Sequence, residues 1–98
     1  MKPELQISAR AKRDLARIIA YTRKHNPDAA KQLGYSLQRH MLLLLDFPFL
    51  GRDRANLTPE ARSLAAGNHL IIYRARPDRI TILRVIDGRM DVEAEFKR

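Results

Sequence analysis

Two short turns in the C-terminal half constrain the fold more than any other feature of the sequence. Gly67-Asn68 and Pro77-Asp78 each separate two runs rich in Ile, Leu, Val, Tyr or Ala. Strands joined by two-residue turns pair antiparallel, because a parallel pair needs a much longer crossover connection. The pattern therefore predicts three strands, at about residues 62–66, 69–76 and 79–86, arranged as an antiparallel meander.

Two amphipathic stretches precede this meander and predict a helical hairpin. Ser8 is a good N-cap, and it is followed by a stripe of apolar residues with helical spacing: Ala11, Leu15, Ile18 and Ile19. Asn26-Pro27 ends this helix after His25 and begins a second one at about residues 28–46, because Asn caps helices and Pro is favoured in their first turn. So short a connection makes the two helices antiparallel.

The segment PELQIS (residues 3–8) alternates apolar and polar residues and predicts one further short strand. Phe47-Pro48 stops the second helix, and residues 48–60 are expected to form a loop. The predicted order is β-α-α-β-β-β within a single domain of residues 1–98. This is an α+β fold in which a helical hairpin packs on a small, mainly antiparallel sheet, with the position of the first strand left open.

The charge balance indicates an anionic partner. The net charge is +8, from 19 Lys and Arg against 11 Asp and Glu, which suits nucleic acid, the ribosome or an acidic protein. The chain has no cysteine, no long apolar run, no glycine-rich phosphate loop and no histidine pair at metal-ligand spacing. We therefore expect a cytoplasmic protein that uses no cofactor or metal and does not associate with membranes.

One arginine in the last predicted strand falls among apolar neighbours. Strand alternation places Ile80 and Ile82 on the same face as Arg84, with Leu83 and Val85 on the opposite face. An arginine in such a setting extends to solvent or pairs with a carboxylate. A functional role is the alternative. The candidate carboxylates are Asp46, Asp87 and Asp91.

The run MLLLL (residues 41–45) is apolar on every side of the second helix. Two leucines left in water would forgo about 3–6 kcal/mol, a large share of a small domain's stability. The run therefore indicates either a fully buried helix end or a hydrophobic groove that receives a partner.

Four segments occur in the same order and at similar spacing in a known family. SARAKRDLARIIAYTRKHNPDAA, DFPFLGR, ARSLAAGNHLIIYRA and RITILRVIDGRMD resemble the opening helix and the later motifs of the RelE/ParE toxins of type II toxin–antitoxin modules. The resemblance extends over residues 5 to 91, and the family fold has the β-α-α-β-β-β order.

This resemblance implies a small basic toxin held in a hetero-oligomer with an acidic cognate antitoxin. The antitoxin's C-terminal segment would cover the leucine run and the apolar face of the sheet. Operator DNA would be contacted only through the antitoxin. The leucines of the run, Leu42 to Leu45, would form a docking surface. The individual residues expected to bind the antitoxin are Leu37, Met41, Leu44 and Leu45 of the second helix and Ile72 and Arg74 of the sheet.

The motifs resemble the ParE-like subgroup most, which implies a toxin that poisons DNA gyrase without catalysis of its own. Four residues at the end of the last strand and just after it are expected to meet the target: Arg84, Arg89, Met90 and Asp91.

Two alternatives remain. A RelE-like, ribosome-dependent mRNA endonuclease would use Arg62 and Arg89, although Glu95 and Phe96 stand where the nuclease subgroup carries a C-terminal Tyr. A non-toxic antitoxin-binding module is the other alternative, because Asp87-Gly88-Arg89-Met90 departs from the usual ParE-like segment.

Overall fold

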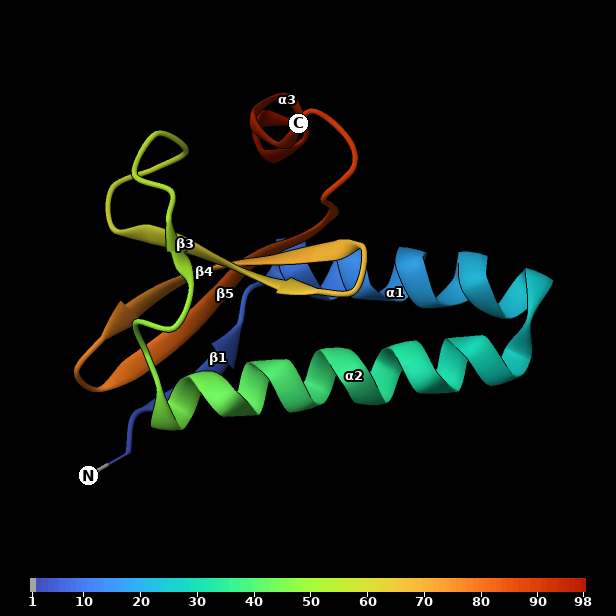
Figure 1. Ribbon diagram of the computed structural model, residues 1–98, viewed down its shortest axis with the longest axis horizontal. Coiled ribbons are helices and arrows are strands. Elements are labelled where there is room, and N and C mark those ends of the chain that lie inside the picture. Colours follow the sequence, from blue (N-terminus) through green and yellow to red (C-terminus); the bar gives the residue numbers. More distant parts are fainter. Residues whose placement is uncertain (1) are drawn as a thin grey trace.

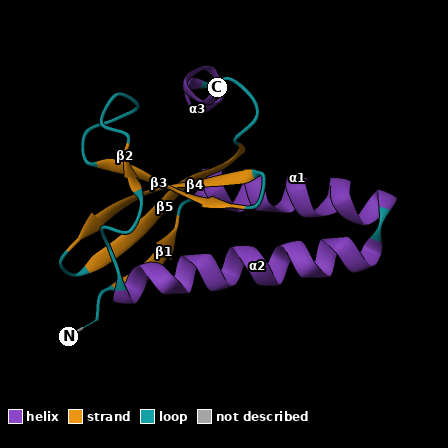
Figure 2. Cartoon of the chain, in the orientation of Figure 1, coloured by secondary structure: helices purple, strands orange, loops and turns teal. Residues whose placement is uncertain are grey.

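A five-stranded sheet forms the centre of the molecule, as shown by the computed structural model, which describes residues 2–98 (Figures 1 and 2). Its strands lie in the order β1-β5-β4-β3-β2. They are β1 (Glu4–Ile7), β2 (Arg52–Asp53), β3 (Ala61–Ala66), β4 (His69–Arg76) and β5 (Arg79–Asp87). The antiparallel meander predicted at the C-terminal half is confirmed as β3-β4-β5.

The structure adds two elements to the predicted order and places the first strand. β1 lies at one edge of the sheet and pairs parallel with β5, with Leu5 opposite Ile80. The expected loop of residues 48–60 contains the two-residue strand β2, which pairs with β3. A short helix, α3 (Val92–Lys97), follows β5.

The helical hairpin has the predicted bounds and caps. α1 (Ala9–His25) is capped by Ser8, whose Oγ accepts from the Ala11 amide at 3.0 Å and donates to the Leu83 carbonyl at 3.0 Å. Asn26 ends α1, and its side chain caps α2 (Pro27–Asp46) by accepting from the Ala29 amide at 3.1 Å. Among residues 2–98, no helix is long and apolar enough to span a membrane.

The two faces of the sheet carry separate hydrophobic clusters. The helix face packs against α1 and α2, and its cluster includes Leu37, Leu44, Ile71 and Tyr73. The outer face carries a smaller cluster of buried residues, Ala61, Ile72 and Ile86, against which α3 and the loop after β2 pack. Figure 1 shows the hairpin on one side of the sheet and α3 on the other.

A β-bulge in β5 overturns the predicted alternation of that strand. Ile72 of β4 is opposite Arg84, whereas the next residue, Tyr73, is opposite Ile82, so that Leu83 is the extra residue. Val85 therefore joins Ile82 in the cluster on the helix face, and Leu83 packs in the outer cluster. The expectation that Leu83 and Val85 share a face was wrong, because the extra residue reverses the alternation at this point.

Candidate functional site

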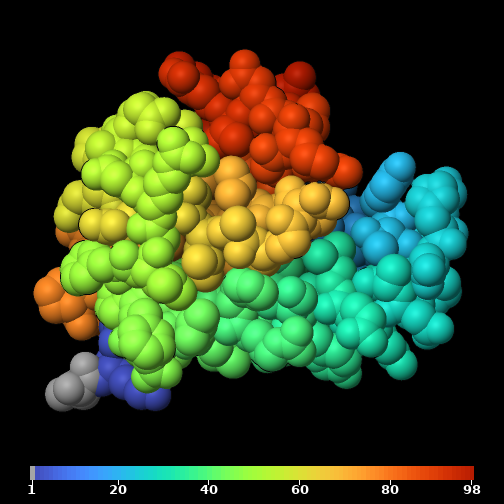
Figure 3. Space-filling view, in the orientation of Figure 1, coloured from blue at the N-terminus to red at the C-terminus, as the bar shows by residue number. Residues whose placement is uncertain are grey.

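A cleft of about 450 Å³ opens between α1 and the C-terminal segment that follows β5. In Figure 3 a hollow separates this segment, in red, from α1, in blue. Three of the four residues predicted to meet a target line the cleft: Arg84, Arg89 and Met90. Other ionisable residues, which were not among those predicted to meet a target, also line it, among them Arg10, Arg17, His69, Glu95 and Arg98.

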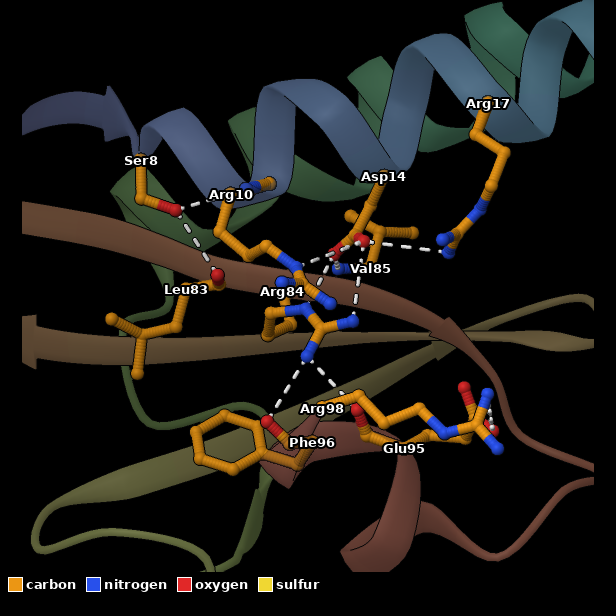
Figure 4. Close-up of polar contacts among 11 residues, drawn as sticks. Ser8, Arg10, Asp14, Arg17, Leu83, Arg84, Val85, Glu95, Phe96 and Arg98 are labelled. Carbon is orange, nitrogen blue, oxygen red and sulfur yellow. Dashed lines mark hydrogen bonds and ion pairs between the residues drawn. The ribbon is translucent and has the colours of Figure 1, made fainter.

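Arg84 forms the floor of this cleft and links α1 to α3. Its Nε and Nη2 donate to the two carboxylate oxygens of Asp14 at 2.7 and 3.2 Å. Its Nη1 donates to the backbone carbonyls of Glu95 and Phe96 at 2.9 and 3.0 Å (Figure 4). Asp14 also accepts from the Val85 amide at 3.0 Å. All three guanidinium nitrogens are therefore engaged inside the protein.

This geometry corrects two expectations about Arg84. Asp14 of α1 takes the place of the predicted partners, which were Asp46, Asp87 and Asp91. Arg84 is also only 4% exposed, so its guanidinium is not presented to a target as the sequence suggested. Its role in this structure is to connect elements.

Arg89 stands at the rim of the cleft and is exposed. Its Nε and Nη2 donate to the carboxylate of Asp87 at 3.0 and 2.8 Å, and its backbone amide donates to the same carboxylate at 2.9 Å. These hydrogen bonds hold the pKa of Asp87 at about 2, below its ordinary value of 3.8. Burial lowers the pKa of the neighbouring His69 and so favours its neutral imidazole, although the nearby Asp87 carboxylate acts in the opposite direction.

The two residues after Arg89 differ in what they offer a partner. Met90 is 53% exposed and places a large apolar side chain at the cleft. Asp91 instead caps α3, because its Oδ1 accepts from the Ala94 amide at 3.2 Å. Arg89 and Met90 therefore offer exposed side chains at the cleft, whereas Asp91, although exposed, uses one carboxylate oxygen to cap α3.

The pair expected of a nuclease, Arg62 and Arg89, is not brought together. Arg62 donates its Nη1 to the Gly51 carbonyl at 2.9 Å, and its guanidinium lies 5.0 Å from the centre of the Phe49 ring. Arg89 follows the end of β5 that is level with Ala66, and Arg62 lies four positions before Ala66 in β3, about 13 Å along the sheet. The structure therefore holds the two guanidinium groups at different places, one on the Gly51 carbonyl and the other on the Asp87 carboxylate.

A second surface, an apolar groove of about 390 Å³, lies between α1, α2 and β1. Two residues predicted to bind the antitoxin, Leu37 and Met41, line it, although each is at most 3% exposed. Leu42 also lines the groove and is 46% exposed. The remaining lining residues are Leu5, Ile7, Leu15, Ile19, Gly34 and Gln38.

The other residues predicted to bind the antitoxin lie elsewhere. Leu44 and Ile72 are wholly buried in the two clusters, so direct contact with a partner is excluded for them in this structure. Leu45 and Arg74 are half-buried, and the Nε of Arg74 is buried without a hydrogen-bond partner. The leucines of the MLLLL run that do reach the surface are Leu42 and Leu43.

Comparison with known proteins decides the family. Residues 5–92 match the family described as ParE toxin of type II toxin-antitoxin system, parDE. The chain belongs to the ParE toxin family. The resemblance to RelE/ParE toxins, and within them to the ParE-like subgroup, is thus confirmed, together with the expected α+β fold.

Individual ParE relatives extend this match over the whole chain. Toxin ParE1 of Caulobacter vibrioides is 32% identical over 97 residues, which cover 98% of this chain and 99% of the relative. Toxin ParE3 of the same organism is 41% identical over 50 residues, about half of each chain. A solved structure titled Chromosomal ParDE TA system from P. aeruginosa shares the fold, with a TM-score of 0.75 at 20% identity, over 88% of this chain and 96% of that one.

The described residues can also be compared with what a metal site requires. Across residues 2–98, no three His, Cys, Asp or Glu side chains gather closely enough to hold a metal ion. The cleft is instead a mixed surface of arginines, two acids, an imidazole and exposed apolar groups. Such a surface suits recognition of another macromolecule.

Proposed function

We propose that this chain, as a ParE-type toxin, stops growth by poisoning DNA gyrase through protein contact and is neutralised by direct binding of an acidic antitoxin. The observation that carries the proposal is the separation of two surfaces on one small domain. The cleft beside α3 is charged, and the groove between α1, α2 and β1 is apolar. Each surface fits a different partner.

The target surface is the cleft rim, with Arg89 and Met90 as its contact residues. Arg89 is held in place by Asp87, and Met90 adds exposed apolar area next to it. Arginine is enriched in protein-binding hot spots, and methionine is common at surfaces that bind other proteins. Because Arg62 lies at the other end of the sheet, the nuclease pair derived from the sequence has no shared site, which favours inhibition without catalysis.

The antitoxin surface is the apolar groove. Its occupant would be an amphipathic segment whose apolar residues fill the groove above Leu37 and Met41 and contact Leu42. Acidic residues flanking that segment would complement the net charge of +8. In this complex the two proteins form a hetero-oligomer, and operator DNA is contacted by the antitoxin.

One observation favours the endonuclease alternative, but with different catalytic residues from those expected from the sequence. His69 and Arg89 line the same cleft, with Arg17 on the facing helix. A neutral imidazole can accept a proton from a ribose hydroxyl, and arginines can stabilise the charge that develops on the phosphate. If the chain cleaves mRNA, its base is therefore His69 and its cation Arg89, in place of the pair Arg62 and Arg89.

Induction without antitoxin, followed by pulse labelling of DNA, RNA and protein synthesis, separates these functions. Gyrase poisoning predicts that DNA synthesis stops first. The double variant Arg89→Ala/Met90→Ala should abolish this arrest, whereas Arg23→Ala, an exposed arginine near the end of α1, should leave it intact. An early stop in protein synthesis that requires His69 would contradict the gyrase proposal.

The antitoxin surface has its own test, which uses the cognate acidic antitoxin that this proposal requires. Leu42→Glu places a carboxylate in the apolar groove and should weaken binding roughly tenfold or more, because an unpaired charge would be buried. Leu50→Glu is the matched control, since Leu50 is 49% exposed and lies outside the groove. Equal binding by both variants would contradict this placement.

A further inference from the structure

The short helix α3 cannot hold its own position. It has six residues, and isolated helices of fewer than about 12 residues are marginal in water. Its place beside the cleft must therefore come from contacts with the rest of the protein. Two kinds are present: Val92 and Phe96 pack on the outer cluster, and Arg84 donates to the carbonyls of Glu95 and Phe96.

Arg84 reaches α3 only in an orientation that Asp14 sets. The carboxylate of Asp14 receives Nε and Nη2 along one edge of the guanidinium, and this leaves Nη1 directed at the last turn of α3 (Figure 4). There the cation meets carbonyls of the last turn at the negative end of the helix dipole, one of which, that of Glu95, also accepts from the Arg98 amide at 3.3 Å. Asp14 and Arg84 have side chains that are 1% and 5% exposed, so water does not compete for these contacts.

Several further groups besides Arg84 hold the carboxylate of Asp14 in place. It accepts from the Val85 amide of β5 at 3.0 Å, and Arg10 and Arg17 lie 3.8 and 3.5 Å from its Oδ1. The carboxylate is therefore attached to the strand as well as to α1. Movement of α3 relative to α1 would have to break this network at Arg84.

We infer that Asp14 and Arg84 are positioning residues, and that their buried pair sets where the C-terminal segment lies and so shapes one wall of the cleft. Neither residue touches the target in this arrangement. They act through α3 and through the preceding turn that carries Arg89 and Met90. The consequence for growth rests on the proposed function, but the placement of α3 does not, and it can be measured by itself.

Amide hydrogen exchange of the purified protein, read residue by residue, tests this inference. Arg84→Lys keeps a cation beside Asp14 but removes the planar fork that also reaches the carbonyls of Glu95 and Phe96. We expect the amide of Glu95, which donates to the Asp91 carbonyl, to exchange roughly tenfold faster than in the unmodified protein. The exchange rates of the β4 amides should change much less. Arg23→Lys, at an exposed position near the end of α1, is the matched control and should leave α3 protection unchanged.

Two results would overturn the inference. Equal acceleration of α3 and β4 amides in Arg84→Lys would show that the pair supports only global stability. Unchanged protection of α3 would show that Val92 and Phe96 hold the helix without it.

A second variant keeps the test decisive if Arg84→Lys does not fold. Asp14→Leu/Arg84→Met replaces the ion pair by apolar groups of similar length, an exchange that buried pairs in proteins often tolerate. We expect this variant to retain protected β4 amides and to lose protection across α3. Protection of α3 equal to that of the unmodified protein would overturn the inference. Growth assays of the same variants would then report separately on whether the position of α3 matters for toxicity.

Discussion

The two faces of the sheet are stabilised in different ways. The helix face buries an extensive apolar cluster under two long helices whose ends are capped by Ser8 and Asn26. The outer face buries Ala61, Ile72 and Ile86 under a six-residue helix, a loop and the buried ion pair of Arg84. The first face buries the larger apolar cluster, so we expect it to contribute more to the folding free energy, whereas the second supports the segment that we assign to the target. Segments of this second kind open most readily in proteins, and they often carry function.

The largest effect should come from the helix face. Leu44→Ala removes a side chain that is 0% exposed and should lower the free energy of unfolding by about 2–5 kcal/mol. Leu83→Ala removes a half-buried leucine from the outer cluster and should have a clearly smaller effect. Denaturant unfolding of both variants measures the difference. Equal losses of unfolding free energy in the two variants would contradict the proposed difference between the two faces.

The next effect concerns the hydroxyl of Tyr73, which anchors the loop after α2. It donates to the Pro48 carbonyl at 2.8 Å and accepts from the Gly51 amide at 2.9 Å. Tyr73→Phe leaves both groups unsatisfied and should lower the free energy of unfolding by about 1–3 kcal/mol. Tyr35→Phe, at a site 58% exposed, should have no measurable effect in the same unfolding experiment. A stable Tyr73→Phe protein would show that water replaces the hydroxyl.

On the outer face, Phe96→Ala should lower the global free energy of unfolding by about 1 kcal/mol, because Phe96 is half-buried and its helix can detach without unfolding the sheet. Thermal unfolding monitored by circular dichroism measures it, with Phe47→Ala, at a site 58% exposed, as the control. A loss as large as that of Leu44→Ala would mean that α3 belongs to the main cooperative unit.

The smallest effect is a pH dependence at the cleft rim. The folded pKa of Asp87, about 2, is below its ordinary 3.8, so this carboxylate stabilises the fold above pH 4 and its contribution is lost as the pH falls from 4 towards 2. Asp87→Asn should therefore lower stability at neutral pH and converge with the unmodified protein near pH 2. In an Arg89→Ala background the same substitution should have a smaller effect, because only the hydrogen bond from the backbone amide of residue 89 to the carboxylate remains. A pH-independent difference would contradict this assignment.

Local signals explain why most of the fold could be predicted. Gly67-Asn68 and Pro77-Asp78 set the meander, and Asn26-Pro27 set the hairpin, because turn and cap preferences act within a few residues. The β-bulge at Leu83 could not be predicted, since it depends on which residues of β4 and β5 pair. The position of β1 and the formation of α3 likewise depend on tertiary contacts.

The candidate site was harder to predict for the same reason. Asp14 and Arg84 are 70 residues apart in the chain, although one signal was present: Asp14 lies three residues after Ala11 and four before Ile18, on the apolar stripe of α1. A charged residue on a buried stripe needs a buried partner. Leu37, Met41 and Leu44 were expected to bind the antitoxin, whereas the structure buries them and leaves Leu42 as the leucine of that run exposed at the groove.

The most direct test of the central claim is DNA cleavage and supercoiling by purified gyrase in the presence of this protein. Gyrase poisoning through the cleft predicts that the protein increases cleaved plasmid and reduces supercoiling, that Arg89→Ala/Met90→Ala removes most of both effects, and that Arg23→Ala preserves them. Adding the antitoxin should reverse both effects. Unchanged supercoiling and cleavage at excess protein would contradict the claim.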